Sequence, residues 1–370
     1  MPYLHYDMPK YPCEADMWDM LARERRPIVV YGMGNGADKL IARLEKYGVR
    51  IADFFASDGF VRGHLFHGMR VKSFSEIKET YPDFLILLSF ASNRAEVLEM
   101  LEEINGEYDM LVPDMPVAGE DEYFDREFYN AHYEELLRAR DALADEESRC
   151  AFSAMLNYKL SGRMEYLLGA YSDREDIYSL IPADSIEFAV DAGAYNGDTL
   201  REMKEYFPRL KKALALEPDV RNFKKLLKYS EAETEISIKP INAAAWCENM
   251  DGEFFGSGNR NSSVSSTASF QHRDQAVRLV RIDSLCDGRV DYIKYDVEGA
   301  EAEALEGSRL TIERDLPAML VSAYHRSRDI FALVNLLAER NPVYKIYLRR
   351  LRCVPAWELN LILIPEKREV

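Results

Sequence analysis

Short apolar runs alternate with amphipathic stretches in the second half of the chain. The apolar runs predict strands, and the spacing of apolar residues between most of them predicts helices. The predicted strands are 186–191, 213–217, 236–242, 291–296, 317–323, 343–350 and 359–365. The predicted helices are 197–207, 219–229, 299–313 and 327–340. Strands that alternate with helices indicate an α/β fold with a mostly parallel sheet.

The first half of the chain shows the same alternation on a smaller scale, followed by a change of pattern. Apolar runs predict three strands there, at 27–32, 49–57 and 84–89. Residues 119–181 instead carry apolar side chains at helical spacing, with acidic clusters at helix starts. We therefore expect an N-terminal arm (1–26), a smaller Rossmann-like α/β domain (27–118), a helical connector (119–181) and a seven-stranded Rossmann-like domain (182–370).

An insertion separates the third and fourth predicted strands of the larger domain. It spans 251–277 and contains a polar loop, 256–267, that is rich in serine, glycine and asparagine. Loops of this length without apolar content are often functional or mobile. We therefore regard the insertion as a candidate functional segment.

Charge and cysteine content narrow the class of protein. Lys and Arg total 47 against 64 Asp and Glu, for a net charge of −17 over 370 residues. Such an acidic chain is a poor match for phosphate-tracking nucleic-acid binding or for docking on an anionic membrane. The five cysteines include no C-x-x-C pair, so we expect neither a zinc site nor a disulfide framework. With no signal-peptide pattern and no apolar run of membrane-spanning length, we expect a cytoplasmic protein. The sequence is compatible with a homo-oligomer and leaves the oligomeric state open.

Three arginines form a basic cluster within this acidic chain. Arg349, Arg350 and Arg352 lie on and just after a predicted strand. A solvated strand face is the commoner role of such a cluster. A site for a phosphate or carboxylate group of a ligand is the alternative.

A glycine-rich turn joins the first strand of the larger domain to its helix. The turn reads Asp-Ala-Gly-Ala-Tyr-Asn-Gly-Asp-Thr over residues 191–199. Glycines let the backbone approach a ligand closely, and the N–H groups of the turn and helix start then face it. Glu217 ends the next predicted strand, where a carboxylate can accept both hydroxyls of a ribose. The pattern predicts a nucleotide-type cofactor site at this edge of the sheet.

The segment 182–370 resembles the FkbM-type family of S-adenosylmethionine-dependent methyltransferases. The resemblance rests on 191–199, Leu-Glu-Pro-Asp at 216–219, Arg-Ile-Asp-Ser-Leu at 281–285 and Lys-Tyr-Asp-Val-Glu-Gly-Ala-Glu at 294–301, with a closing strand pair at 344–350 and 358–365. It implies S-adenosyl-L-methionine as cofactor and a hydroxyl of a sugar, a glycoconjugate precursor or another secondary metabolite as acceptor. It implies cofactor contacts from Asp191, Gly193, Ala194, Tyr195, Gly197, Glu217, Asn242 and Ala243.

Candidate catalytic residues follow two later strands. Methyl transfer from a sulfonium requires alignment, and a hydroxyl acceptor also requires a base. We expect His325 to accept the proton and Asp296 to orient the acceptor or the imidazole. Glu298 and Tyr178 are expected to contact the acceptor. Asp296, Glu298 and Glu301 have the ligand chemistry of a hard-cation site. Capping of the next helix is the favoured role of Glu301 and explains Glu298 equally well, and no metal is assigned.

The N-terminal domain leaves two other functions open. Its Gly32-x-Gly34-x-x-Ala37 turn fits a dinucleotide fingerprint, and Asp58 ends the next apolar run. A nicotinamide-dependent sugar oxidoreductase or epimerase is therefore one alternative, and a non-catalytic nucleotide-binding module is another. Only three strands are predicted and no Tyr-x-x-x-Lys pair follows. We therefore favour a scaffold or acceptor-recognition role for this domain.

Overall fold

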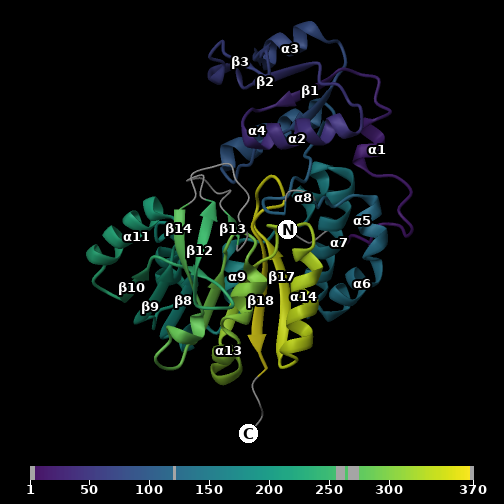
Figure 1. The fold of residues 1–370 in the computed structure, drawn as a ribbon. Helices are drawn as coiled ribbons and strands as arrows, with labels where there is room; N and C mark the ends of the chain where they lie inside the picture. Colours follow the sequence, from purple (N-terminus) through teal and green to yellow (C-terminus); the bar gives the residue numbers. More distant parts are fainter. Residues whose placement is uncertain (1–4, 120–121, 256–262, 266–274, 367–370) are drawn as a thin grey trace.

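The computed structural model describes residues 5–119, 122–255, 263–265 and 275–366. Figure 1 shows the smaller α/β domain above the larger one, with the connector helices beside the larger sheet. Before the first sheet lies the short helix α1 (Met17–Leu21). Within the described residues, no helix is both long and apolar enough to cross a membrane.

The N-terminal domain is built on a parallel sheet in the order β5-β2-β1-β6-β7. Its strands are β1 (Ile28–Tyr31), β2 (Asp53–Ala56), β5 (Lys72–Ser73), β6 (Leu85–Leu88) and β7 (Met110–Leu111). Around it lie α2 (Asn35–Lys46), α3 (Phe74–Thr80), α4 (Ala95–Glu107) and the small hairpin β3 (Leu65–Phe66) and β4 (Met69–Arg70). The expectation of three strands is corrected to five, because two-residue strands leave no periodic pattern.

Asp58 has a structural role in this domain. Its carboxylate accepts hydrogen bonds from the backbone N–H and the hydroxyl of Ser75, at 3.2 and 2.6 Å. These bonds hold the turn after β2 against the first turn of α3.

The larger domain is built on a seven-stranded sheet in the order β10-β9-β8-β15-β16-β18-β17. Its strands are β8 (Phe188–Ala192), β9 (Lys212–Leu216), β10 (Ser237–Ile241), β15 (Tyr292–Tyr295), β16 (Ala318–Ser322), β17 (Tyr344–Arg350) and β18 (Leu359–Pro365). All are parallel except β18, which runs antiparallel to both neighbours. The predicted strands of this domain are confirmed. Winding reverses between β8 and β15, which is where open α/β sheets bind ligands.

Helices connect most of these strands. They are α10 (Asp198–Tyr206), α11 (Val220–Ala232), α12 (Glu301–Glu306), α13 (Arg309–Asp315) and α14 (Asp329–Arg340). The single helix expected over 299–313 is thus two helices. The buried Ser308 lies at the interruption, where its hydroxyl is 2.6 Å from that of Tyr295 on β15.

The insertion adds a small second sheet. Its described strands are β12 (Met250–Phe255), β13 (Ser263–Ser265) and β14 (Gln275–Val280), and they join β11 (Ala244–Ala245) in the order β11-β14-β12-β13. Most of the polar loop 256–267 lies outside the described residues, so its expected role stays a prediction.

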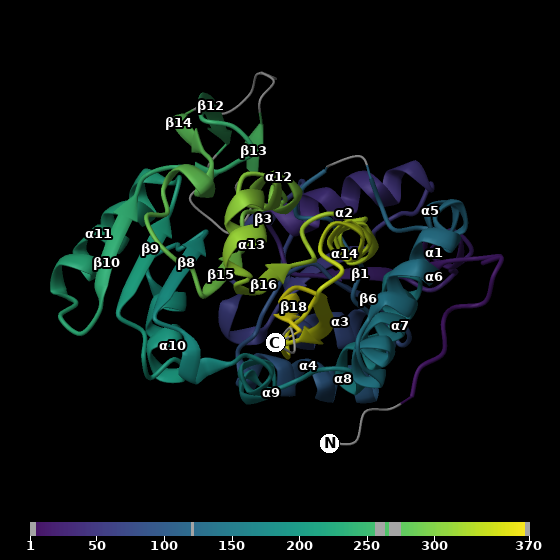
Figure 2. The same ribbon diagram turned by 90° about the horizontal axis from the view of Figure 1, so that it is seen from below.

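The connector is helical, as its spacing predicts. It contains α5 (Arg126–Ala131), α6 (Tyr133–Ala142), α7 (Glu146–Ser161), α8 (Met164–Gly169) and α9 (Arg174–Leu180). Figure 2 shows α6 and α7 alongside α14 and β18, and α6 packs on α14 while α7 packs on β17. One apolar core joins Val29 of the first sheet, Phe152 of α7 and Val190 of the second sheet. The connector therefore ties the two sheets into one body.

The basic cluster is buried rather than solvated. Arg349 pairs with Asp145 at 2.6 Å and Glu147 at 3.0 Å, and it donates to the Ser148 hydroxyl at 2.8 Å. Arg350 donates to the carbonyl of Leu167 at 2.7 Å. The sequence-based expectation of a solvated strand face is therefore wrong for these two residues, which fasten β17 to the connector.

We expect Arg349→Met to lower the free energy of unfolding by about 3–5 kcal/mol. The substitution removes the cation that pairs with the carboxylates of Asp145 and Glu147. Urea unfolding followed by circular dichroism measures the change. Arg352→Met is the matched control: Arg352 pairs with Glu102 at a site about one-third exposed, where ion pairs contribute roughly 0–1 kcal/mol. Equal effects of the two substitutions would contradict the fastening role of Arg349.

Candidate active site

A cavity of about 260 Å³ opens at the carboxyl edge of the larger sheet. The turns after β8, β9 and β15 line it, together with α9 of the connector and the loop before β18. Asn93 and Val117, from the N-terminal half of the chain, also line the cavity. The site therefore lies where the two domains meet.

The glycine turn holds three strand ends together. Gly193 has φ +91°, and a Cβ there would lie 1.9 Å from the carbonyl oxygen of Asp296, so only glycine fits. The N–H groups of Gly193 and Ala194 donate to the carbonyl of Leu216 at 3.0 and 2.9 Å. Gly197 has φ +84° and packs against the ring of Tyr229. Gly193 thus lines the cavity, whereas Ala194 and Gly197 are not among the described lining residues.

Glu217 is buried and lines the same cavity. Its two carboxylate oxygens accept hydrogen bonds from the N–H groups of Tyr195 and Asp219, each at 2.8 Å. Burial raises the pKa of Glu217 to about 8 despite these donors. Tyr195, with φ +46°, is partly exposed and lines the cavity beside it. The expected ribose acid therefore faces the glycine turn.

Asn242 supports this turn from behind. Its side-chain amide donates to the carbonyls of Glu217 and Pro218 at 2.8 and 3.1 Å. Ala243, the next residue, lines the cavity, but Asn242 is not among the described lining residues. Ala243 therefore forms part of the cavity wall, and Asn242 fixes the shape of the turn that carries Glu217.

A buried lysine lies between two aspartates on the central strands. Lys294 on β15 is opposite Asp191 on β8 in the sheet register. Its ammonium is 3.7 Å from Asp191 and 3.3 Å from Asp296, and it donates to the Thr199 hydroxyl at 3.1 Å. Burial raises the pKa of Asp191 to about 6, and neither of its oxygens accepts a hydrogen bond from a described residue.

His325 lies within a set of carboxylates. It is 1% exposed and is not among the described lining residues. Its Nδ1 is 2.9 Å from Glu301, and its Nε2 is 3.4 Å from Asp296 and 3.7 Å from Glu298. Burial opposes protonation, but these carboxylates outweigh burial and raise the pKa of His325 to about 10. A histidine that is already protonated at neutral pH cannot accept a proton, so the geometry does not support His325 as the base.

Asp296 and Glu298 line the cavity with different protonation behaviour. Burial pushes the pKa of Asp296 upward, but Lys294 and His325 outweigh it and hold the pKa below its usual value. Tyr324 also donates its hydroxyl to Asp296 at 3.3 Å. Burial raises the pKa of Glu298 to about 8. Glu298 has φ +56°, an uncommon backbone conformation for a non-glycine residue, of the kind that concentrates at functional sites.

The hard-cation site considered from the sequence consists of Asp296, Glu298 and Glu301. These three carboxylates do not form a metal-binding group in the described structure. Glu301 accepts the N–H groups of Val297 and Gly299 at 3.0 and 3.4 Å, as a cap for the turn before α12. A different buried group, Glu301, His325 and Asp329, has ligand atoms within 4.8 Å of one another. Asp329 in turn accepts the N–H of Arg326 at 2.7 Å.

Several lining residues carry no local sequence signal. Tyr178 lines the cavity, as expected, and stacks on Tyr206 with ring centroids 3.9 Å apart. Polar side chains that the sequence did not single out line it as well: Arg174, Glu202, Asn222, Lys294, Tyr324, Glu358 and Asn360. Lys294 alone had a detectable signal, because it shares a strand face with Asp296 in an otherwise apolar run.

A mostly parallel sheet that reverses its winding at a cavity, with a glycine turn and a strand-end acid, is typical of Rossmann-like ligand-binding domains. Residues 191–344 match the family model of the Methyltransferase FkbM domain. The resemblance seen in the sequence is therefore confirmed for this segment of the chain.

Solved structures show how far the fold extends. The methyltransferase FkbM of Methylobacillus flagellatus KT is similar over 97% of this chain and 94% of its own, with a TM-score of 0.69 and 20% identity. That likeness includes the N-terminal domain and the connector. Two other structures are similar over about half of this chain. An rRNA methylase of Streptococcus thermophilus covers 52% of this chain and 94% of its own, with a TM-score of 0.34 and 12% identity. Fibrillarin of Aeropyrum pernix covers 50% of this chain and 69% of its own, with a TM-score of 0.33 and 19% identity. No curated protein matches the chain.

We expect the melting temperature of the ligand-free protein to fall as the pH rises from about 5 to about 8. Glu217 and Glu298 have folded-state pKa values near 8 against 4.5 for an ordinary glutamate, so the folded state binds more protons across this window. Their contribution is complete below pH 4.5 and is lost as the pH rises through 8. His325 acts in the same direction between 6.5 and about 10.

Scanning calorimetry at several pH values measures this dependence, and Glu298→Gln should make it shallower. Glu24 and Glu233, whose pKa values are held near 2 by ion-paired partners, lose their contribution only below pH 4.5. A melting temperature that rises between pH 5 and 8 would show that the cavity carboxylates are ionised in the folded protein.

Proposed function

We propose that the protein transfers a methyl group from S-adenosyl-L-methionine to an oxygen of a small acceptor. The observation that carries this proposal is the cavity at the winding reversal, which brings the glycine turn, Glu217 and Asp296 together within an FkbM methyltransferase domain. When bound, the cofactor supplies an activated methyl group, so the protein must mainly align donor and acceptor.

The cavity residues fit this cofactor chemically. A sulfonium and an amino group are both cationic, and the cavity is lined by Glu217, Asp296 and Glu298. Glu217 retains lone pairs beyond its two backbone donors, so it can accept hydrogen bonds from ribose hydroxyls. The backbone of Gly193 and Tyr195 is placed to line the methionine part, and Ala243 offers a small side chain next to a flat base. Asp191 and Lys294 complete the charge balance behind the turn.

We assign the role of general base to Glu298, which accepts the proton that the acceptor hydroxyl loses. Its Oε2 is buried and accepts no hydrogen bond from a described residue. Its pKa near 8 leaves a minority of the carboxyl groups ionised at neutral pH, and this ionised fraction, which is the form that acts as base, grows as the pH rises. His325, held as a cation behind Asp296 and Glu298, is then a positioning residue. Asp296, ionised between Lys294 and His325, is the carboxylate that orients the acceptor hydroxyl.

The acceptor we favour is a sugar or a glycoconjugate precursor. Polar side chains on the connector side of the cavity, among them Arg174, Glu202 and Asn360, offer donors and acceptors for several hydroxyls. Tyr178 adds an aromatic face, which suits a sugar ring. The net charge of −17 supports a small acceptor over a nucleic acid, and a cytoplasmic site of action remains part of the proposal.

Isothermal titration of the full chain with S-adenosylmethionine, S-adenosylhomocysteine and NAD tests the function. We expect the first two to bind once per chain and NAD not to bind. Glu217→Gln should weaken S-adenosylhomocysteine binding by roughly 1–3 kcal/mol, because an NH₂ group that cannot accept from the ribose replaces one of the two carboxyl oxygens.

Glu231→Gln, a substitution on the exposed face of α11, is the control and should leave binding unchanged. Unchanged affinity in a folded Glu217→Gln protein would remove Glu217 from the site. NAD binding in place of S-adenosylmethionine would favour the oxidoreductase alternative.

Glu298→Gln should lower turnover by about 100- to 10,000-fold, the usual effect of losing a general base. The assay is S-adenosylhomocysteine release with an acceptor selected from a panel of sugars and nucleotide sugars. Affinity for S-adenosylhomocysteine should stay within a few-fold of wild type. A Glu298→Gln enzyme of full activity would exclude this base and leave alignment alone to explain transfer.

A further inference from the structure

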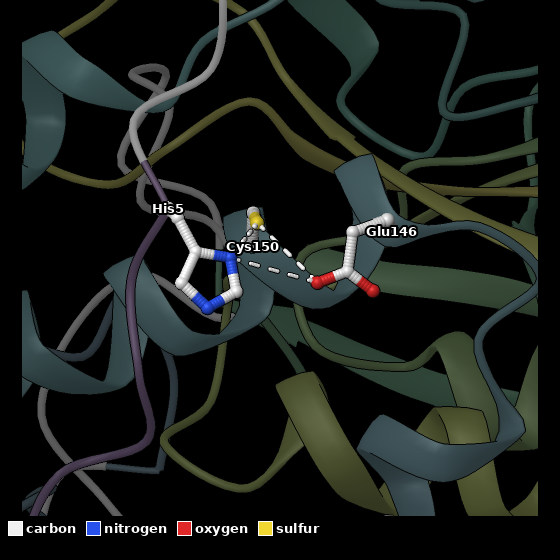
Figure 3. Close-up of side chains that lie close together, drawn as sticks. All are labelled: His5, Glu146 and Cys150. Carbon is white, nitrogen blue, oxygen red and sulfur yellow. Dashed lines mark hydrogen bonds and ion pairs between the residues drawn. The ribbon is translucent and has the colours of Figure 1, made fainter.

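Three side chains of types that bind metals meet at the surface of the protein. None of them is among the residues that line the cavity. His5 lies on the N-terminal arm, and Glu146 and Cys150 lie one turn apart on α7 (Figure 3). His5 is 65% exposed as a side chain, whereas Cys150 is buried at 5%. Figure 3 shows the imidazole, the thiol and one carboxylate oxygen directed at a common point.

The spacing of these atoms fits a tetrahedral metal ion. Cys150 Sγ is 3.7 Å from His5 Nδ1 and 3.9 Å from Glu146 Oε1, and the nitrogen and the oxygen are 3.7 Å apart. Zinc bonds of about 2.3 Å to sulfur and about 2.0–2.2 Å to nitrogen and oxygen place tetrahedral ligands roughly 3.3–3.6 Å apart. A contraction of a few tenths of an ångström would therefore close the site around an ion.

Outer contacts orient two of the three ligands. The second ring nitrogen of His5, Nε2, is 3.4 Å from Asp7, the arrangement that fixes the tautomer of metal-binding histidines. The second oxygen of Glu146, Oε2, accepts a hydrogen bond from Arg149 at 2.9 Å, so Oε1 is left to face the cluster. Each polar ligand thus presents one atom inward and has its other atom occupied.

The arm is already positioned by contacts that do not involve the cluster. Asn157 donates to the carbonyl of Asp7 at 2.9 Å, and Tyr129 donates to the carbonyl of Pro9 at 2.6 Å. The site is therefore organised before any ion binds. This lowers the entropic cost of bringing His5 to a helix some 145 positions away in the chain.

We propose that His5, Glu146 and Cys150 bind a divalent cation of the zinc type, which fastens the N-terminal arm to α7. Mixed sulfur, nitrogen and oxygen ligands favour zinc over magnesium or calcium. The thiol loses its proton to become the sulfur ligand, so each ion bound releases one proton and binding strengthens with rising pH. Water completes the coordination. The cysteine spacing did not predict this site, because a local motif such as C-x-x-C cannot reveal a ligand that comes from a segment 145 positions away.

Weak hydrogen bonds from the thiol are the alternative explanation for the same contacts. Cobalt(II) distinguishes the two, because a thiolate bound to cobalt gives a charge-transfer band in the near ultraviolet and tetrahedral coordination gives visible bands. The protein is the full chain without a histidine tag, reduced and treated with chelator. We expect one Co²⁺ per chain with both bands, and loss of both on adding Zn²⁺.

Cys150→Ser should abolish the charge-transfer band. His5→Gln, on an exposed arm where misfolding is not a concern, should weaken Co²⁺ binding by more than the roughly 10- to 100-fold that loss of an outer contact costs. Cys247→Ser, a half-buried cysteine outside the cluster, is the matched control and should retain the band. Binding without a thiolate band would place the ion elsewhere, for instance at Glu301, His325 and Asp329, and would overturn the proposal, as would unchanged binding by His5→Gln.

Discussion

The placement of Lys294 between Asp191 and Asp296 on the central strands helps to keep Asp296 ionised in the cavity. Lys294 and Asp191 are opposite one another in the register of β15 and β8, at the point where the winding of the sheet reverses. Placing one cation there holds the pKa of the neighbouring Asp296 low. Burial instead raises the pKa values of Glu217 and Glu298 to about 8. One cavity therefore contains carboxylates in two protonation states at neutral pH, a pattern typical of catalytic sites.

Hydrophobic patterning predicted the larger sheet almost completely, because its strands are long, apolar and separated by turn residues. It failed where the signal is too short or too local. The strands β5 and β7 have two residues each, and the interruption at Ser308 depends on a hydroxyl contact with Tyr295 that no sequence window contains. The burial of Arg349 likewise follows from carboxylates on α7, about 200 positions away.

The sequence predicted the positions of some site residues but not the directions of their side chains. Residues at strand ends, such as Gly193, Glu217 and Asp296, could be placed from the sequence because the carboxyl ends of parallel strands share one edge. The direction of a side chain could not. His325 follows β16 as expected, but its ring lies between Glu301 on one side and the cavity-lining Asp296 and Glu298 on the other, and these carboxylates raise its pKa. Lining residues such as Asn93 and Val117 come from the packing of one domain on the other.

The docking of α7 on β17 has a consequence for biosynthesis. The backbone N–H of Leu348 donates to the hydroxyl of Ser148, a contact that spans 200 positions. At about 5–20 residues per second, translation takes roughly 10–40 s to cover that interval. During this time the buried face of α7, including Phe152 and Leu156, has no strand to cover it. We expect this face of α7 to be a site of chaperone contact until β17 is made.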